Sequence, residues 1–192
     1  MTVTKTQTET PMLRQYREIK AQCEEAILFF RLGDFYEMFM NDAKVASKEL
    51  EITLTGRGKD ESRIPMCGIP YHAAESYILR LVSKGYKVAV CEQTEDASLT
   101  KGLTKREIVR IITPGTVIEQ GALDAKENNY LVAVNTIPKT EKLGISFVDI
   151  TTGEFKIMTV ENKDDLTSQL ERLNTKEVLI SSEIELELNT QI

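Results

Sequence analysis

The sequence predicts an α/β protein: a mixed sheet flanked by helices, followed by the first part of a second α/β domain. Short apolar runs bounded by polar residues indicate strands, and segments with apolar residues at helical spacing lie between them. A change of composition in the polar stretch 121–129, GALDAKENN, marks a domain boundary. We therefore expect a first domain over residues 1–115, a linker over 116–128 and a second domain over 129–192.

The first domain begins with a helix and a buried strand. Thr10 is a candidate N-terminal cap followed by proline, so a helix is expected from Pro11 to Cys23. The run Ala26–Phe30, AILFF, is continuous, apolar and short, which is typical of a buried strand. The pair Asn41-Asp42 then supplies an Asx cap for a second helix, whose apolar residues fall near one face.

The remainder of the first domain alternates strands with loops and one helix. Glycine and charge make 56–63 a polar loop, and the two prolines of 64–70 exclude a regular helix there. Residues 72–83 carry apolar side chains at helical spacing, with Gly85 near the end of that helix. The expected strands are 52–55, 86–91 and 107–113, the last two joined by the charged loop 92–106.

The second domain shows a different order of elements. Three expected strands are followed by an amphipathic helix and a further strand. These elements cover 130–134, 143–150, 154–160, 164–173 and 177–180. Thr151-Thr152-Gly153 is a glycine-containing hairpin connection between the second and third strands. No closing helix is evident before the end of the sequence, so we expect a truncated domain.

Composition indicates an ordinary globular protein without a disulfide or zinc framework. The chain is 41% hydrophobic and 28% charged, and its three cysteines form no CxxC pair. We expect three half-buried thiols in a reducing cytoplasm. His72 is the single histidine, which excludes a site built on several imidazoles. No apolar run approaches the roughly 18 residues that span a bilayer, so we expect a cytoplasmic location and no membrane partner.

The net charge of −6 is unevenly distributed, because residues 1–125 sum to −1 and residues 126–192 to −5. An acidic surface disfavours a polyanion as partner. A surface that meets phosphates therefore belongs in the first part, where the segment 101–110, KGLTKREIVR, holds four basic residues against Glu107. A solvated charged loop explains the same segment, and the sequence leaves both interpretations open.

The segment 31–39, RLGDFYEMF, combines a Gly-Asp turn with an aromatic and an acidic side chain. In extended backbone Phe35 and Glu37 share one face, and Tyr36 points to the other. Phe35 and Phe39 could both be core residues, with Glu37 at the strand edge. Alternatively, an exposed ring and a carboxylate address a base step of a nucleic acid, because apolar wedges kink a duplex where stacking is weak.

The wedge interpretation requires phosphate contacts from neighbouring basic residues, because phosphates repel a carboxylate. Such a carboxylate is tolerated if it makes a specific hydrogen bond to a base edge, with or without an added proton. The candidates for phosphate contacts, chosen from charge and loop position, are Arg57, Lys59 and Lys105.

A competing interpretation places a metal-dependent nuclease in the second domain. Asp149 ends one expected strand and Glu154 begins the next, an arrangement similar to that of ribonuclease H-like nucleases, which hold magnesium with clustered acids. Two-metal catalysis needs further carboxylates, and only Glu171 is topologically suitable. We favour the simpler interpretation that Asp149 and Thr151 cap a hairpin. No GxxxxGK[ST] phosphate loop occurs, so this chain is not expected to hydrolyse nucleotides.

The segment Gly33–Phe39, GDFYEMF, closely resembles the Phe-x-Glu mismatch-recognition motif of the MutS family of bacterial DNA mismatch-repair proteins. Further motifs of that family occur in the same order, so that the resemblance covers residues 10–117. These motifs are FFRLGD (29–34), ITLT (52–55), IPMCGIPYH (64–72), CEQ (91–93) and VRIITPGT (109–116).

The resemblance implies a role for each domain and for two residues. Residues 1–115 would form the mismatch-binding domain, a mixed sheet flanked by helices. Residues 129–192 would begin the connector domain, which is ribonuclease H-like in fold but not known as a nuclease in the family. Phe35 would stack on the mispaired or unpaired base from the minor groove, and Glu37 would hydrogen-bond that base.

Members of the family are much longer and carry lever, clamp and ATPase domains, so the chain resembles an N-terminal fragment. ATP and magnesium would belong to the ATPase domain. We therefore expect this chain to need no cofactor, to hold no metal and not to be an enzyme by itself. The expected partners are mismatched or looped duplex DNA and, for the longer protein, a second copy in a homodimer and downstream repair proteins.

Overall fold

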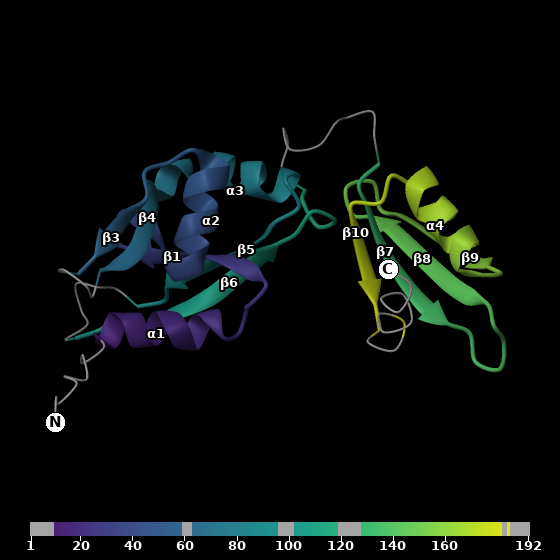
Figure 1. Cartoon of the computed structure of the whole chain (residues 1–192), viewed down its shortest axis with the longest axis horizontal. Coiled ribbons are helices and arrows are strands. Elements are labelled where there is room, and N and C mark those ends of the chain that lie inside the picture. Colours follow the sequence, from purple (N-terminus) through teal and green to yellow (C-terminus); the bar gives the residue numbers. More distant parts are fainter. Residues whose placement is uncertain (1–9, 59–62, 96–101, 119–127, 182–183, 185–192) are drawn as a thin grey trace, which may run out of the picture. The chain divides into compact units, whose positions relative to one another are not determined.

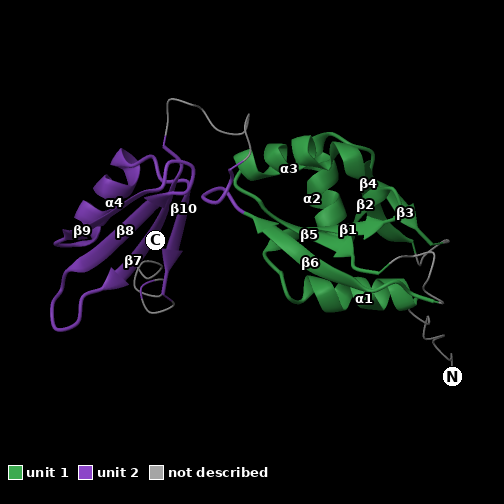
Figure 2. Cartoon of the chain, turned by 180° about the vertical axis from the view of Figure 1, so that it is seen from behind, with its two compact units in different colours: residues 1–112 green, residues 113–192 purple. Residues whose placement is uncertain are grey.

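The computed structural model divides the chain into two compact units, Met1–Ile112 and Thr113–Ile192 (Figure 2). We describe each unit by itself. The residues that the structure describes are 10–58, 63–95, 102–118, 128–181 and 184. The predicted linker 116–128 therefore lies largely outside them, and its bounds stay a prediction.

The first unit is built on a six-stranded mixed sheet with the order β3-β4-β2-β1-β5-β6 (Figure 1). The central strand β1 pairs parallel with β5 and antiparallel with β2, while the other pairs are antiparallel. The strands are β1 (Ala26–Leu32), β2 (Phe35–Phe39), β3 (Thr55–Arg57), β4 (Ile64–Pro70), β5 (Lys87–Gln93) and β6 (Arg106–Ile112). This arrangement confirms the predicted mixed α/β fold.

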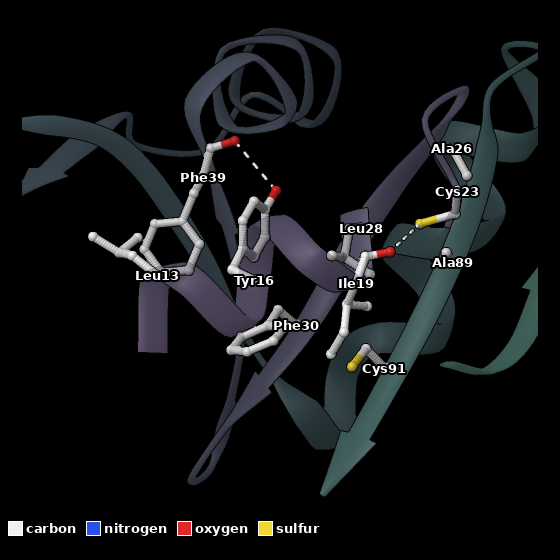
Figure 3. Close-up of a cluster of buried hydrophobic side chains, with 10 residues drawn as sticks. All are labelled: Leu13, Tyr16, Ile19, Cys23, Ala26, Leu28, Phe30, Phe39, Ala89 and Cys91. Carbon is white, nitrogen blue, oxygen red and sulfur yellow. Dashed lines mark hydrogen bonds between the residues drawn. The ribbon is translucent and has the colours of Figure 1, made fainter. Parts of the chain in front are cut away.

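Helices cover both faces of this sheet, with α1 on one side and α2 and α3 on the other (Figure 1). Their bounds are α1 (Pro11–Lys20), α2 (Met40–Leu50) and α3 (Ala74–Ser83), with the short 3₁₀ helix η2 (Tyr71–Ala73) before α3. On the α1 side, Tyr16 packs edge-to-face on Phe30 and Phe39, with ring centroids 5.4 and 5.0 Å apart (Figure 3). Aromatic edge-to-face contacts of this kind fix the helix on the sheet.

The first helix is shorter than predicted. Thr10 accepts a hydrogen bond from the Leu13 amide, as expected of its N-cap. The helix ends at Lys20 instead of Cys23, because the next amides bond three residues back: Gln22 to Ile19 and Cys23 to Lys20, both at 3.0 Å. These tighter bonds form a turn that brings the chain into β1.

The second helix begins earlier than predicted, and its expected cap has another role. Helix α2 starts at Met40, whose φ is 55°, and Phe39 provides no side-chain cap. Asp42 is buried, with 7% of its surface exposed. Its carboxylate accepts from the Leu28 amide at 2.9 Å and from the Tyr16 hydroxyl at 3.2 Å, and pairs with Lys20 at 2.9 Å. Asp42 therefore joins α1, β1 and α2.

Two expected strands differ from the observed ones. Residues 52–54 are irregular, and β3 instead includes Gly56 and Arg57, which the sequence placed in a loop. Pairing with β4 decides this difference, because Thr55 lies opposite Met66 and Arg57 opposite Ile64. Strands β5 and β6 are displaced by one or two residues from the predicted ranges. The segment 64–70 is not helical, as predicted, and forms β4.

All three cysteines lie in the first unit and are free and buried. They are more buried than the half-buried state that we expected from the sequence: Cys67 and Cys91 expose none of their surface, and Cys23 exposes 8%. Burial raises the pKa of the Cys67 and Cys91 thiols to about 12, so both are protonated at neutral pH. These thiols act as small apolar side chains of the core.

The second unit is a four-stranded sheet with the order β10-β7-β8-β9. Its elements are β7 (Tyr130–Thr136), β8 (Leu143–Asp149), β9 (Glu154–Val160), α4 (Lys163–Arg172) and β10 (Glu177–Ile180). After three antiparallel strands and a helix, β10 pairs parallel with β7. This is the order predicted for the start of a ribonuclease H-like domain. Leu166 of α4 contributes to the core of this unit, together with inward-facing residues of β7 and β8.

Replacement of Asp42 tests its role as the joint between α1, β1 and α2. We expect Asp42→Ala to lower the free energy of unfolding of the first unit by about 3 kcal/mol, because it removes the ion-pair partner of Lys20 and leaves the buried Leu28 amide without an acceptor. Urea unfolding followed through amide signals of the first unit measures this. The control is Glu24→Ala, which removes an exposed carboxylate. Equal effects of the two changes would contradict the assignment.

Candidate nucleic-acid interface

A two-residue turn places Phe35 at the tip of the β1–β2 hairpin. Leu32 lies opposite Phe35, so that Gly33 and Asp34 form the whole connection. Gly33 has a φ of 57°, and a glycine with positive φ at the first turn position is typical of a type II′ hairpin. A turn of this type matches the twist of the two strands that it joins. The second strand, β2, can therefore begin directly after the turn, at Phe35.

The extended backbone predicted for Phe35–Glu37 is confirmed, and with it the alternation of faces. Phe35 is 48% exposed, whereas Tyr36 and Phe39 are buried. Glu37 shares the face of Phe35 and lies opposite Phe30 of β1. Of the two phenylalanines, only Phe39 belongs to the core, so the interpretation of both as core residues is wrong for Phe35. An exposed ring therefore stands beside a half-buried carboxylate.

Glu37 is paired with one of the predicted phosphate contacts. Arg57 of β3 reaches it with Nη1, 3.0 Å from Oε2. Burial raises the pKa of the Glu37 carboxyl above its usual range, and the charge and hydrogen bond of Arg57 oppose this shift without cancelling it. The carboxylate is 19% exposed and the arginine 47%, so the guanidinium lies toward solvent. Because the pKa is raised, the neutral form of Glu37 is populated at a higher pH than the neutral form of an ordinary glutamate. This neutral form can donate a hydrogen bond.

The remaining basic candidates contribute less than their charges imply. Lys105 is exposed but pairs with Glu107 at 2.6 Å. Arg106, from the same basic segment, is buried, and its side chain donates to the carbonyls of Arg31 and Thr104. Lys59 lies outside the described residues. The charge count of the basic segment therefore overstates the positive surface that it presents.

The structure also brings together residues that our sequence reasoning did not single out. The Arg31 guanidinium lies over the Tyr71 ring, 3.8 Å from its centroid, and 3.6 Å from a carboxylate oxygen of Glu92. Tyr36 donates its hydroxyl to the same carboxylate. All four residues fall in motifs shared with the family, but no spacing rule connects positions so far apart in the sequence. Their contacts become visible only in the folded sheet.

In the second unit, Asp149 is a structural carboxylate. It is 1% exposed and accepts hydrogen bonds from the amides of Asn129, Thr151 and Thr152 and from the Thr151 hydroxyl. Burial alone would raise its pKa, but these hydrogen bonds outweigh burial and lower it. This geometry is the hairpin cap that we favoured from the sequence. Among the described residues, no group of three or more His, Cys, Asp and Glu side chains could hold a metal ion.

Comparison with known proteins identifies both units. A family model described as MutS domain I matches residues 10–121, and one described as MutS domain II matches residues 129–191. The chain belongs to the MutS family. The part of the chain that the structure describes contains no helix long and apolar enough to cross a membrane.

Similar proteins named DNA mismatch repair protein MutS occur in several bacteria. The chain is 54% identical to the protein of Halalkalibacterium halodurans over 90% of its own length and 20% of that protein. It is 52% identical to the Staphylococcus haemolyticus protein over 95% of the chain and 21% of that protein. The Pelotomaculum thermopropionicum protein is 56% identical over 88% of the chain and 20% of its own length. The chain thus spans about one fifth of these relatives.

Removal of the Arg57 charge tests how the carboxylate of Glu37 is tuned. We expect Arg57→Gln to raise the pKa of Glu37 further, because the guanidinium is the group that lowers it against the effect of burial. The pH titration of the side-chain carboxyl carbon signal measures this. The matched control is Lys84→Gln, which removes an equally exposed cation paired with Glu49. A pKa of Glu37 that does not rise in Arg57→Gln would show that the ion pair does not persist in solution.

Proposed function

We propose that the first unit reads mismatched or looped duplex DNA without catalysing a reaction, with Phe35 as a wedge at a base step. The observation that carries this proposal is the exposed Phe35 ring at the start of β2, on the same face as Glu37. Nearly half of a large apolar side chain faces solvent, although the strand continues directly into the core at Met38 and Phe39. The family assignment of this unit supports the same conclusion.

The wedge distinguishes duplexes through the free energy needed to open a base step. Inserting an apolar side chain costs a few kcal/mol of unstacking, and the cost is smallest where pairing or stacking is already weak. Stacking of a base on an aromatic ring returns about 1 to 3 kcal/mol. A difference of this size corresponds to about one to two orders of magnitude in affinity. Phe35 therefore detects a mismatch through its lower deformation energy, without requiring a particular base sequence.

Glu37 gives the inserted wedge a polar contact with the displaced base. Its position on the Phe35 face brings the carboxyl to the same base step. The burial that raises its pKa favours the protonated form, and the nearby phosphates of DNA act in the same direction. A neutral carboxyl can donate a hydrogen bond to a base nitrogen or oxygen. Arg57, released from the ion pair, is then a candidate contact for a phosphate, as is Lys105.

The wider assembly also forms part of the proposal. Because the relatives are about five times longer than the chain, we assign ATP and magnesium binding, homodimer formation and contacts with downstream repair proteins to the longer polypeptide or its other domains. The isolated chain binds DNA weakly under this proposal. No observation favours the alternative nuclease centred on Asp149, whose Oδ1 accepts hydrogen bonds from the hairpin residue Thr151 and whose Oδ2 accepts one from the Asn129 amide.

Truncation of the wedge tests the proposal directly. We expect Phe35→Ala to remove the preference for a duplex with one unpaired base over the matched duplex, a loss of about ten- to a hundredfold. Titration of the labelled chain followed by NMR measures both affinities even when binding is weak. The matched control is Phe155→Ala, which removes another exposed phenylalanine, on β9 of the second unit. An unchanged preference in Phe35→Ala would exclude the wedge.

The role of Glu37 predicts a different outcome from that of Phe35. We expect Glu37→Gln to retain DNA binding while it narrows the ratio between mismatched and matched duplexes, because the amide remains polar but cannot titrate. The same pair of titrations measures this, with Glu49→Gln as the control for loss of an ion-paired carboxylate. If Glu37→Gln and Phe35→Ala lost the same amount of binding to every duplex, the two residues would not have separate roles.

A further inference from the structure

We infer that Arg31 and Tyr71 are positioning residues that hold the Phe35 turn rigid, and that this rigidity sets how well mismatched and matched duplexes are distinguished. The inference rests on the function proposed above. In the part of the chain that the structure describes, the side chains of Arg31 and Tyr71 form no hydrogen bond, ion pair or ring contact with Phe35 or Glu37. The contacts that carry it are those of the turn backbone and of the Arg31 side chain.

The two turn residues are held at both of their carbonyl oxygens. Arg31 donates from Nε to the carbonyl of Gly33. The amide of Tyr71 donates to the carbonyl of Asp34 at 2.9 Å, which extends the β2–β4 pairing beyond Phe35. The Arg31 side chain and the backbone amide of Tyr71, which directly follows β4, therefore hold the two carbonyls of the turn.

The Arg31 side chain is in turn held on three sides. Its guanidinium lies 3.8 Å from the Tyr71 ring centroid and 5.6 Å from that of Tyr36. Glu92 of β5 lies 3.6 Å away and also accepts the Tyr36 hydroxyl. The arginine is only 17% exposed. A planar guanidinium stacked on an aromatic ring and paired with a carboxylate has little conformational freedom, so the hydrogen bond to Gly33 is fixed in place.

Tyr71 is the member of this group that links the turn to the rest of the sheet. It follows Pro70, which lies opposite Phe35, and begins the 3₁₀ helix that leads into α3. Tyr71 is 45% exposed, so it lies outside the core, and its ring packs on the Arg31 guanidinium. The backbone of Tyr71 holds Asp34 and its ring holds Arg31. The same residue therefore supports both contacts of the turn.

The rigidity of the turn matters because the inserted ring opens a base step only if its own backbone does not move away from the DNA. A mobile hairpin could swing away from a matched duplex and avoid the unstacking cost, which would reduce the difference between matched and mismatched DNA. A mobile hairpin would also lose conformational entropy on insertion, which weakens the mismatched complex. Both effects reduce the ratio of the two affinities. With a fixed turn, the whole difference in unstacking free energy between matched and mismatched duplexes appears as a difference in binding free energy.

The experiment uses Arg31→Met and Tyr71→Leu, which remove the guanidinium and the aromatic ring respectively. We expect the backbone order parameter of the Phe35 amide to fall from about 0.85 toward about 0.6 in both variants, as measured by NMR relaxation of the chain. The ratio of affinities for the unpaired-base and matched duplexes should fall by about threefold or more. Tyr71→Phe should retain both values, because the ring and not the hydroxyl contacts Arg31.

Controls separate this inference from the proposed function and from general loss of stability. Arg80→Met removes an exposed arginine on α3 and should change neither the order parameter nor the ratio. If Phe35→Ala removes discrimination but Arg31→Met and Tyr71→Leu keep it, the positioning role is wrong while the wedge stands. If Phe35→Ala itself keeps discrimination, the proposed function fails and the inference with it. Equal weakening of both duplexes in Tyr71→Leu would make Tyr71 a general DNA contact and overturn the inference.

Discussion

The buried carboxylate of Asp42 is the interaction on which the arrangement of the first unit depends. Pairing between β1 and β2 stops at Phe30 and Glu37, because the chain leaves the sheet at Phe39 to start α2. The Leu28 amide thereby loses a strand partner, and a buried amide without an acceptor is costly. Asp42 supplies that acceptor from the first turn of α2 and binds α1 through Tyr16 and Lys20. Asp42 thus takes the place of a strand acceptor for Leu28 at the end of β2 from which α2 begins.

Much of the fold could be predicted from local patterns, and the differences have identifiable causes. The apolar run 26–30, the helical spacing in 72–83 and the proline-rich segment 64–70 are local signals, and each gave the correct kind of element or exclusion. Asp42 shows why other predictions failed. By its residue type and position it predicts a helix cap, but the groups that it binds, on Tyr16 and Leu28, are distant in the sequence. Strand β3 failed for the same reason, because Gly56 and Arg57 are extended only through pairing with β4.

The candidate site, too, could be predicted only where the signal is local in the sequence. Period-two geometry predicted that Phe35 and Glu37 share a face, and the resemblance to the MutS family gave that face its role. The exposure of Phe35 and the burial of Phe39 could not be distinguished by residue type, since both are phenylalanines in one strand. Charge and loop position selected Arg57, Lys59 and Lys105 as phosphate contacts and the segment 101–110, which includes Arg106, as a basic surface. Folding instead uses Arg57 as the counter-ion of Glu37 and Arg106 as an internal hydrogen-bond donor.

The distribution of cysteines makes the first unit observable on its own. All three thiols are buried there, and burial holds the pKa of each above its usual range, so an alkylating reagent can reach and attack them only after this part of the chain opens. The rate of alkylation therefore reports the opening equilibrium of the first unit, in which all three thiols lie. A duplex that binds the closed form slows alkylation by the factor through which it stabilises that form. The cysteines thus allow weak DNA binding to be measured in the chain with its own sequence, without a substitution or an attached fluorophore.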